Sequence, residues 1–246
     1  MSLSGYGGAT RLRPNLRFGP PGAVPPVVAR LIALNVVVYL LQQFTGDWCT
    51  REFALIPALV ERGEIWRLFT YQFLHGSTFH LAINMFALWM FGSELAPRWG
   101  PRFFLRYYLL CAVGGGILFT LARLGTWVPS VGASGAIYGI LVAYAMWFPN
   151  RRVYLYFVLP IPVRFFIFFL LVLEVSQSMT SSGAGIAHAA HLGGMGFGYA
   201  YLRWNGVSGL QPFPVGTWQR WKLQLRRWRL RREMKARGWD DTNTLH

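Results

Sequence analysis

The chain has 246 residues, of which 54% are hydrophobic and 13% are charged, and it carries a net charge of +15. With so few charged side chains and a mean hydropathy of +0.33, the composition argues against a soluble globular domain, which needs more charge to cover its surface. The two cysteines, Cys49 and Cys111, stand in no CxxC motif and beside no His/Asp cluster. We therefore expect no disulfide framework and no metal site, and no motif indicates a cofactor.

The apolar residues are grouped in blocks of roughly 18 or more, which is the length that crosses a hydrocarbon core of about 30 Å. Residues 1–26 are rich in Gly, Pro and Arg and lack the apolar centre of a signal peptide, so we expect the first block to remain as a span. Pro and Gly mark the block ends. The pattern predicts an all-α, polytopic transmembrane bundle of six spans, at about 27–44, 79–96, 102–122, 133–148, 163–180 and 186–204.

The organisation that follows has three parts: a cytoplasmic N-terminal segment (1–26), a six-span core (27–204) and a basic cytoplasmic tail (205–246). A cytoplasmic N-terminus places most of the 24 Lys and Arg residues on the cytoplasmic side, as the positive-inside rule requires. An even number of spans then places both termini inside. We expect a multi-pass protein, and the compact six-span form favours a bacterial inner membrane.

Two segments of the core are not expected to span. Residues 45–78 form a long external loop with amphipathic stretches, which we expect to lie in the membrane interface. Residues 153–162 are apolar but end in two prolines, and we place them at the cytoplasmic surface before the fifth span.

The tail predicts a helix with one apolar face between residues 217 and 237. Trp218, Trp221, Leu225 and Trp228 recur there at 3-4-3 spacing among many arginines. Such a basic helix would bind lipids on an anionic cytoplasmic leaflet. The alternative is a solvated tail that only enforces the topology, and nucleic-acid binding is not expected.

Polar side chains inside spans are costly and need a reason. They lie toward the external half of three predicted spans: His80 and Asn84 in the second, Ser134 in the fourth, and His188 and His191 in the sixth. A hydroxyl, several imidazoles and a carboxamide therefore reach a similar depth in the bilayer.

These residue types suit acyl transfer. Ser134 can act as a nucleophile if an imidazole removes its proton, and His191 can be that base and later the acid that protonates the leaving amine. His80 and Asn84 lie one turn apart on one helix face. Both can donate hydrogen bonds to an oxyanion together with the Ser134 N–H, and losing one such donor typically costs about 10²–10³ in rate.

Glycines repeat at a spacing of four in the same two helices. Gly135 and Gly139 follow Ser134, and Gly194 and Gly198 follow His191. Small residues at this spacing let two helix backbones approach closely. We expect this approach to allow a short hydrogen bond between Ser134 and His191.

Four sequence elements follow one another in order on the expected spans: Trp66-Arg67, His75-x4-His80-x3-Asn84, Gly132-x-Ser134-Gly135 and Ala190-His191-x-x-Gly194. GxSG alone would be a weak signal, and the specificity comes from the four elements together. With them the chain, over about residues 27–204, resembles a rhomboid intramembrane serine protease.

The resemblance implies a role for each matching position in the chemistry. Ser134 is the implied nucleophile, and His191 rather than His188 is the implied general base. The family uses a Ser–His dyad without a third, acidic member. Its oxyanion contributors on the second span correspond to His80 and Asn84. His188 is left with a structural role, such as orienting His191 or bonding to the loop.

The resemblance also implies supporting roles. Tyr138, one turn after Ser134, is expected to pack against the catalytic imidazole. His75 is expected to organise the loop, and Trp66-Arg67 belong to the external loop that stabilises the fold.

One position departs from the family pattern. The Glu usually found four residues before the Gly at 100 is replaced by Ala96, and Glu94 lies two residues earlier. This puts in doubt a structural hydrogen bond at the cytoplasmic end. Glu174, in the fifth span, is expected to be protonated, paired or facing water, and no chemical role is predicted for it.

The resulting expectation is an intramembrane serine endopeptidase that hydrolyses peptide bonds in or near transmembrane segments of single-pass membrane proteins. An alternative is a non-proteolytic rhomboid-like protein that binds clients, for which a missing Ser or His would be the marker. A transporter or channel that uses the histidines would be expected to show internal repeats, and the two halves of the chain show none. The oligomeric state is not predicted.

Overall fold

The computed structural model describes residues 22–155, 159–180 and 186–207. The predicted helix in the tail therefore lies outside the described residues, as does most of the N-terminal segment. The helices are α1 (Pro26–Thr45), α2 (Asp47–Phe53), α3 (Pro57–Val60), α4 (Arg67–Thr70), η1 (Tyr71–Phe73), α5 (Thr78–Ala87), η2 (Leu88–Gly92), α6 (Ser93–Trp99), α7 (Pro101–Ala122), α8 (Ser134–Trp147), α9 (Val163–Thr180) and α10 (Ile186–Trp204).

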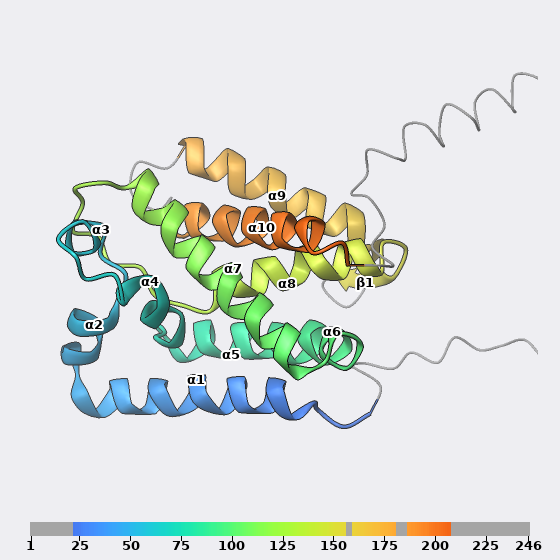
Figure 1. The fold of residues 1–246 in the computed structure, drawn as a ribbon, viewed down its shortest axis with the longest axis horizontal. Helices are drawn as coiled ribbons and strands as arrows, with labels where there is room; N and C mark the ends of the chain where they lie inside the picture. Colours follow the sequence, from blue (N-terminus) through green and yellow to red (C-terminus); the bar gives the residue numbers. More distant parts are fainter. Residues whose placement is uncertain (1–21, 156–158, 181–185, 208–246) are drawn as a thin grey trace, which may run out of the picture.

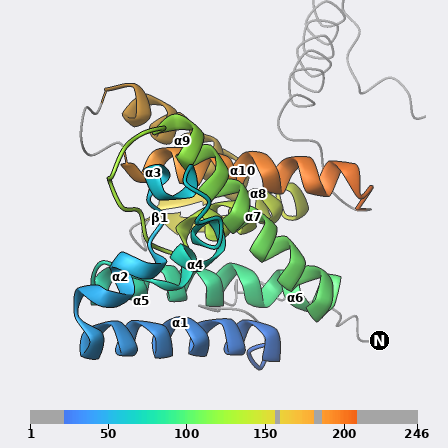
Figure 2. The same ribbon diagram turned by 60° about the vertical axis from the view of Figure 1, so that its left-hand side comes forward.

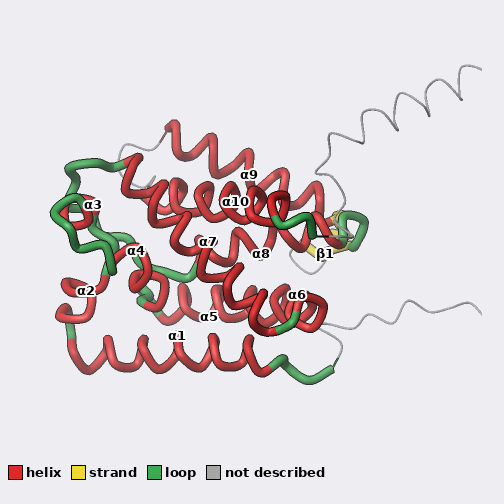
Figure 3. The backbone as a smooth tube through the Cα atoms, viewed as in Figure 1, coloured by secondary structure: helices red, strands yellow, loops and turns green. Residues whose placement is uncertain are grey.

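Helical structure occupies each of the six predicted stretches, so the prediction of a helical bundle is confirmed at that level (Figure 3). The second stretch consists of α5, η2 and α6 in direct succession. Within the described part of the chain, α1 and α7 are long and apolar enough to cross a membrane, and α8 is a shorter apolar helix. The number of six spans stays a prediction.

Helix α8 forms the centre of the bundle. It packs against α7 and α10, while α1 and α5 lie along one side and α9 lies along the other (Figures 1 and 2). Apart from the half-buried Ser134, Tyr138 and Trp147, every α8 residue is buried. A helix that is apolar all round is expected in such a position. The first residue of α8 is therefore held by helices on several sides.

Several helix ends follow from local sequence. Pro26 and Pro101 occupy the first position of α1 and α7, where the missing N–H costs nothing. Ser77 caps α5, and its side chain accepts a hydrogen bond of 3.1 Å from the His80 N–H. Gly100, at φ 76°, separates α6 from α7.

The all-α prediction misses a small hairpin. Strands β1 (Arg152–Leu155) and β2 (Leu159–Pro162) pair antiparallel, with Arg152 opposite Pro162 and Leu155 opposite Leu159. The segment is rich in valine, tyrosine and phenylalanine, which favour strands. A two-stranded sheet has only edge strands, and edge strands tolerate proline.

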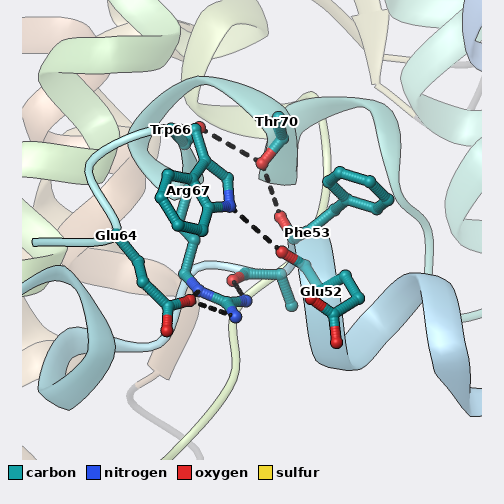
Figure 4. Close-up of polar contacts among 7 residues, drawn as sticks. Glu52, Phe53, Glu64, Trp66, Arg67 and Thr70 are labelled. Carbon is teal, nitrogen blue, oxygen red and sulfur yellow. Dashed lines mark hydrogen bonds and ion pairs between the residues drawn. The ribbon is translucent and has the colours of Figure 1, made fainter.

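The loop between α1 and α5 is held by its own polar groups (Figure 4). The buried Arg67 guanidinium donates to Glu64 at 2.6 Å and to the Ala54 carbonyl at 2.8 Å. The Trp66 indole N–H donates to the Glu52 carbonyl at 3.3 Å. Trp66-Arg67 thus fasten two parts of this loop together. The location of the loop in the membrane interface stays a prediction.

The opposite end of the bundle carries a second polar group, the Glu94 cluster (Glu94, Tyr144 and Arg151). The Tyr144 hydroxyl lies 3.1 Å from Glu94 Oε1, and the Arg151 guanidinium pairs with Glu94 Oε2. Ala96 is buried in the core. At this end of the bundle the carboxylate that contacts Tyr144 and Arg151 comes from Glu94, two residues before Ala96.

Candidate active site

Ser134 begins α8 immediately after a turn that contains a glycine of positive φ. Gly132 has φ +126°, which side-chain-bearing residues rarely adopt, and its N–H donates to the Tyr71 carbonyl at 3.0 Å. As the first residue of α8, Ser134 lies among N–H groups that have no partner within the helix. The turn therefore places the Ser134 hydroxyl beside backbone N–H groups that have no partner within α8.

The structure brings Ser134 and His191 together. The distance between Ser134 Oγ and His191 Nε2 is 2.8 Å, which is a hydrogen bond. The Tyr138 ring stacks on the His191 imidazole, with centroids 4.2 Å apart and planes inclined by 6°. Tyr138 thus packs where the resemblance predicted, and the stack restricts the imidazole to one plane.

The glycines allow this approach. A Cβ on Gly194 would lie 1.9 Å from the Gly135 carbonyl oxygen, so α8 and α10 touch through their backbones. A Cβ on Gly198 would lie 3.2 Å from the Gly139 Cα. The predicted contact of the two helices is confirmed. A third helix joins it, because a Cβ on Gly139 would lie 2.3 Å from Cys111 Sγ of α7.

His80 and Asn84 lie on α5 and line the same cavity as Ser134 and His191, a cavity of about 480 Å³. The His80 ring lies against Gly132, where an added Cβ would be 2.7 Å from His80 Cε1. Asn84 Nδ2 donates to the His80 carbonyl at 3.0 Å, so one amide donor is used within α5. All four predicted site residues therefore meet around one cavity.

His75 contributes mainly through its backbone. Its N–H donates to Gln42 Oε1 of α1 at 2.9 Å, which ties the loop to that helix. The buried His75 ring lies edge-on to the His80 ring, with centroids 5.1 Å apart. Burial, with a smaller effect from His80, lowers the pKa of His75 from 6.5 to about 4. His75 is therefore neutral near neutral pH.

Tyr71 supports the turn before Ser134 from the loop side. Its buried hydroxyl donates to the Ala112 carbonyl of α7 at 2.7 Å, and burial raises the pKa of Tyr71 well above its usual value. No sequence motif marks Tyr71. A single tyrosine in an amphipathic loop does not indicate which backbone carbonyl its hydroxyl will bind.

A carboxylate for which the sequence predicts no chemical role lies behind His191. Glu174, from α9, is 6% exposed. Its Oε1 lies 3.0 Å from His191 Nδ1 and accepts a hydrogen bond from the Tyr138 hydroxyl. Its Oε2 contacts His188 Nδ1. We call Glu174, Tyr138, His188 and His191 the Glu174 cluster. His188 contacts Glu174, whereas His191 lies between Glu174 and Ser134.

One sequence signal pointed to this cluster: an ionisable side chain inside an apolar span normally has a partner. Ligand atoms of Glu174, His188 and His191 also lie within 4.8 Å of one another, a donor set of the type that binds zinc. The sequence predicts no metal site, and the convergence of these three residues does not follow from their spacing along the chain.

The chain is similar to known proteins over most of the described core. The family model described as "Rhomboid domain" matches residues 62–205. "Rhomboid protein 1, mitochondrial" of Saccharomyces cerevisiae is 32% identical over 71% of this chain and 52% of its own length. "Rhomboid protease GlpG" of Photorhabdus laumondii is 27% identical over 73% of this chain and 61% of its own length. "Rhomboid protease GluP" of Bacillus subtilis is 33% identical over 53% of this chain and 26% of its own length.

These relatives limit what the similarity says about location and activity. The chain spans about half the length of the first relatives that it matches. Several of them carry "mitochondrial" or "chloroplastic" in their names. The similarity therefore does not support the predicted bacterial inner membrane.

Proposed function

The chain belongs to the rhomboid family of membrane proteins, whose members are generally intramembrane serine proteases, and we propose that it is itself such a protease. Its proposed reaction is hydrolysis of peptide bonds in or near the transmembrane segments of single-pass membrane proteins. The observation that carries this proposal is the 2.8 Å hydrogen bond between Ser134 Oγ and His191 Nε2 at the edge of a cavity.

In the proposed mechanism, Ser134 Oγ attacks the carbonyl carbon of the scissile bond while its proton passes to His191 Nε2. The oxyanion receives hydrogen bonds from the Ser134 N–H, His80 and Asn84. The His191 imidazolium then protonates the leaving amine, and an acyl-enzyme remains on Ser134. Water, deprotonated by His191, hydrolyses this ester and restores the serine.

A substrate helix hides its carbonyl groups in internal hydrogen bonds, so its backbone must become extended before attack. We propose that the cavity between α5 and α8 receives this extended segment. With six spans and both termini cytoplasmic, the cavity would face the external half of the bilayer.

The test uses the full chain in detergent and in liposomes, with a reporter that has one transmembrane segment. Ser134→Ala and His191→Ala are each expected to abolish cleavage, and a fluorophosphonate probe is expected to label the wild type but not Ser134→Ala. Ser176→Ala, at an exposed serine of α9, is the matched control and should cleave normally. Labelling that persists in Ser134→Ala would refute the assignment.

The alternative is a client-binding protein without proteolytic activity. The same reporter separates the two functions, because a client-binder would retain the reporter without cutting it in either detergent or liposomes. The presence of both Ser134 and His191, in hydrogen-bond contact, favours the protease.

A further inference from the structure

Glu174 lies on the side of His191 that faces away from Ser134. Its Oε1 is 3.0 Å from Nδ1, whereas the other ring nitrogen, Nε2, is 2.8 Å from Ser134 Oγ. The imidazole therefore lies between a hydroxyl from α8 and a carboxylate from α9.

A carboxylate inside a helical bundle is costly unless it is paired. Both oxygens of Glu174 have partners. Oε1 accepts a hydrogen bond from the Tyr138 hydroxyl and lies 3.0 Å from His191 Nδ1, and Oε2 contacts His188 Nδ1. An ionised carboxylate only accepts hydrogen bonds. The arrangement therefore favours a proton on Nδ1 of both histidines.

This placement has a consequence for the tautomer of His191. A neutral imidazole carries one proton. If that proton is on Nδ1, facing Glu174, then Nε2 presents a lone pair to Ser134 Oγ. That is the tautomer a general base needs, and the opposite tautomer could not accept the serine proton.

We propose that Glu174 is a positioning residue that holds His191 in this tautomer and stabilises the imidazolium formed when Ser134 gives up its proton. The site then works as a Ser134–His191–Glu174 triad rather than as a dyad. The serine proton moves to Nε2, the Nδ1 proton stays on His191, and Glu174 stays ionised throughout. This inference rests on the proposed function, because it assigns a role within that reaction.

The contact between His191 and Glu174 is close but is not an aligned hydrogen bond. The Nδ1–Oε1 separation is that of an ion pair, but among the residues that the structure describes His191 Nδ1 makes no hydrogen bond of aligned geometry. Hydrogen bonds in a site without substrate are often misaligned and tighten in the complex. Because the Tyr138 stack keeps the ring in its plane, rotation within that plane or a shift of the carboxylate would align the pair.

His188 acts on the carboxylate rather than on the serine. His188, on α10, contacts Oε2, whereas Tyr138, on α8, contacts Oε1. The two residues together fix the orientation of the carboxyl group. This accounts for two histidines three residues apart that contact different oxygens of one carboxylate. His188 supports Glu174, and Glu174 supports His191.

The main test is Glu174→Gln, which keeps the side-chain volume but puts an amide beside Nδ1. We expect kcat to fall by about 10²–10⁴-fold, because replacing the carboxylate of a catalytic triad by an amide lowers kcat to a similar extent. KM is expected to stay within about twofold, because Glu174 does not line the cavity. The rate of fluorophosphonate labelling should fall with kcat, while the thermal unfolding midpoint stays near that of the wild type.

Two further measurements keep the inference testable if Glu174→Gln does not fold. Glu174→Asp restores a carboxylate on a shorter stem and should retain more activity than Glu174→Gln or Glu174→Ala. In the wild type, the Nδ1 proton of His191 should give a far-downfield proton resonance that is absent in His191→Ala. Ser176→Ala, two residues along α9, should change none of these readouts.

The outcomes separate this inference from the proposed function. A folded Glu174→Gln protein with kcat within about threefold of wild type would overturn the triad and leave the protease intact. A wild type that neither cleaves nor is labelled would overturn the protease, and the downfield resonance would still test the Glu174–His191 contact. Wild-type activity that is lost with EDTA and restored by zinc would also overturn the triad, since the cluster would then hold a metal.

Discussion

The bundle contains two polar clusters of similar design and different composition. In each, a carboxylate meets the hydroxyl of a tyrosine on α8: Glu174 with Tyr138 near one end and Glu94 with Tyr144 near the other. The remaining partners differ. Glu174 faces imidazoles from α10, whereas Glu94 pairs with the guanidinium of Arg151.

This difference decides what each cluster can do. An imidazole exchanges a proton near neutral pH, so a carboxylate beside it can assist proton transfer. A guanidinium stays charged at every relevant pH, so the pair at Glu94 can only hold segments together. The Arg151 side chain is also 45% exposed, which makes its ion pair a weak contributor to stability. We therefore expect chemistry from the first cluster and modest stability from the second.

The largest effect should come from separating α8 and α10, on which the Glu174 cluster depends. In Gly194→Ala the new methyl would meet the Gly135 carbonyl at 1.9 Å, and the displaced backbone should cost more than about 3 kcal/mol of stability. Cleavage should fall by about 10²-fold or more, because Ser134 and His191 move apart. Thermal unfolding and the reporter assay measure the two effects.

Gly196→Ala is the matched control for this variant. Within the described part of the chain, and apart from its chain neighbours and its own helix backbone, nothing lies within 4 Å of an added Cβ there. It should fold and cleave like the wild type. Equal activity in the two glycine variants would show that the backbone contact does not position the site.

A second effect concerns how the stability of the protein changes with pH. We expect this pH dependence to come from His75, beside the site, and not from the ion pair of Arg151. Burial lowers the pKa of His75 from 6.5 to about 4, so the unfolded chain binds more protons than the folded one between these values. The stability that His75 contributes by staying neutral is therefore fully present above about pH 6.5. It is lost as the pH falls toward 4, which lowers the free energy of unfolding by up to about 3 kcal/mol. Unfolding midpoints at pH 7 and pH 4.5 should differ clearly in the wild type.

His75→Gln removes this titrating group and should flatten the pH dependence of the unfolding midpoint. The neighbouring His80 remains in that variant, so the difference between the two proteins isolates His75. An unchanged pH dependence in His75→Gln would contradict the assignment.

The smallest effect, and the sharpest contrast, comes from the two tyrosines. Tyr138→Phe and Tyr144→Phe each remove one hydroxyl that contacts a carboxylate, and each should cost about 1 kcal/mol of stability. Tyr138→Phe should also lower kcat by about 10-fold, because Glu174 loses a donor that holds it. Tyr144→Phe should cleave normally. If the two variants have the same kcat, the two clusters do not differ in function.

Much of the site followed from sequence spacing. His80 and Asn84 share a helix face because they are four residues apart, and the glycines after Ser134 and His191 lie at the spacing that brings two helices together. These relations are set by the geometry of a single helix or by a local motif. The same reasoning placed helices in all six predicted stretches.

The tertiary structure alone decided the rest. A lone Glu174 in an apolar stretch shows that a partner is needed, but the partner depends on how α9 is rotated and on which helix it packs against. For the same reason, only packing revealed that Glu94 meets Tyr144 and Arg151. Periodicity determines which side chains share a face, whereas the contacts between helices determine what that face meets, and the acidic partner of His191 belongs to the second kind.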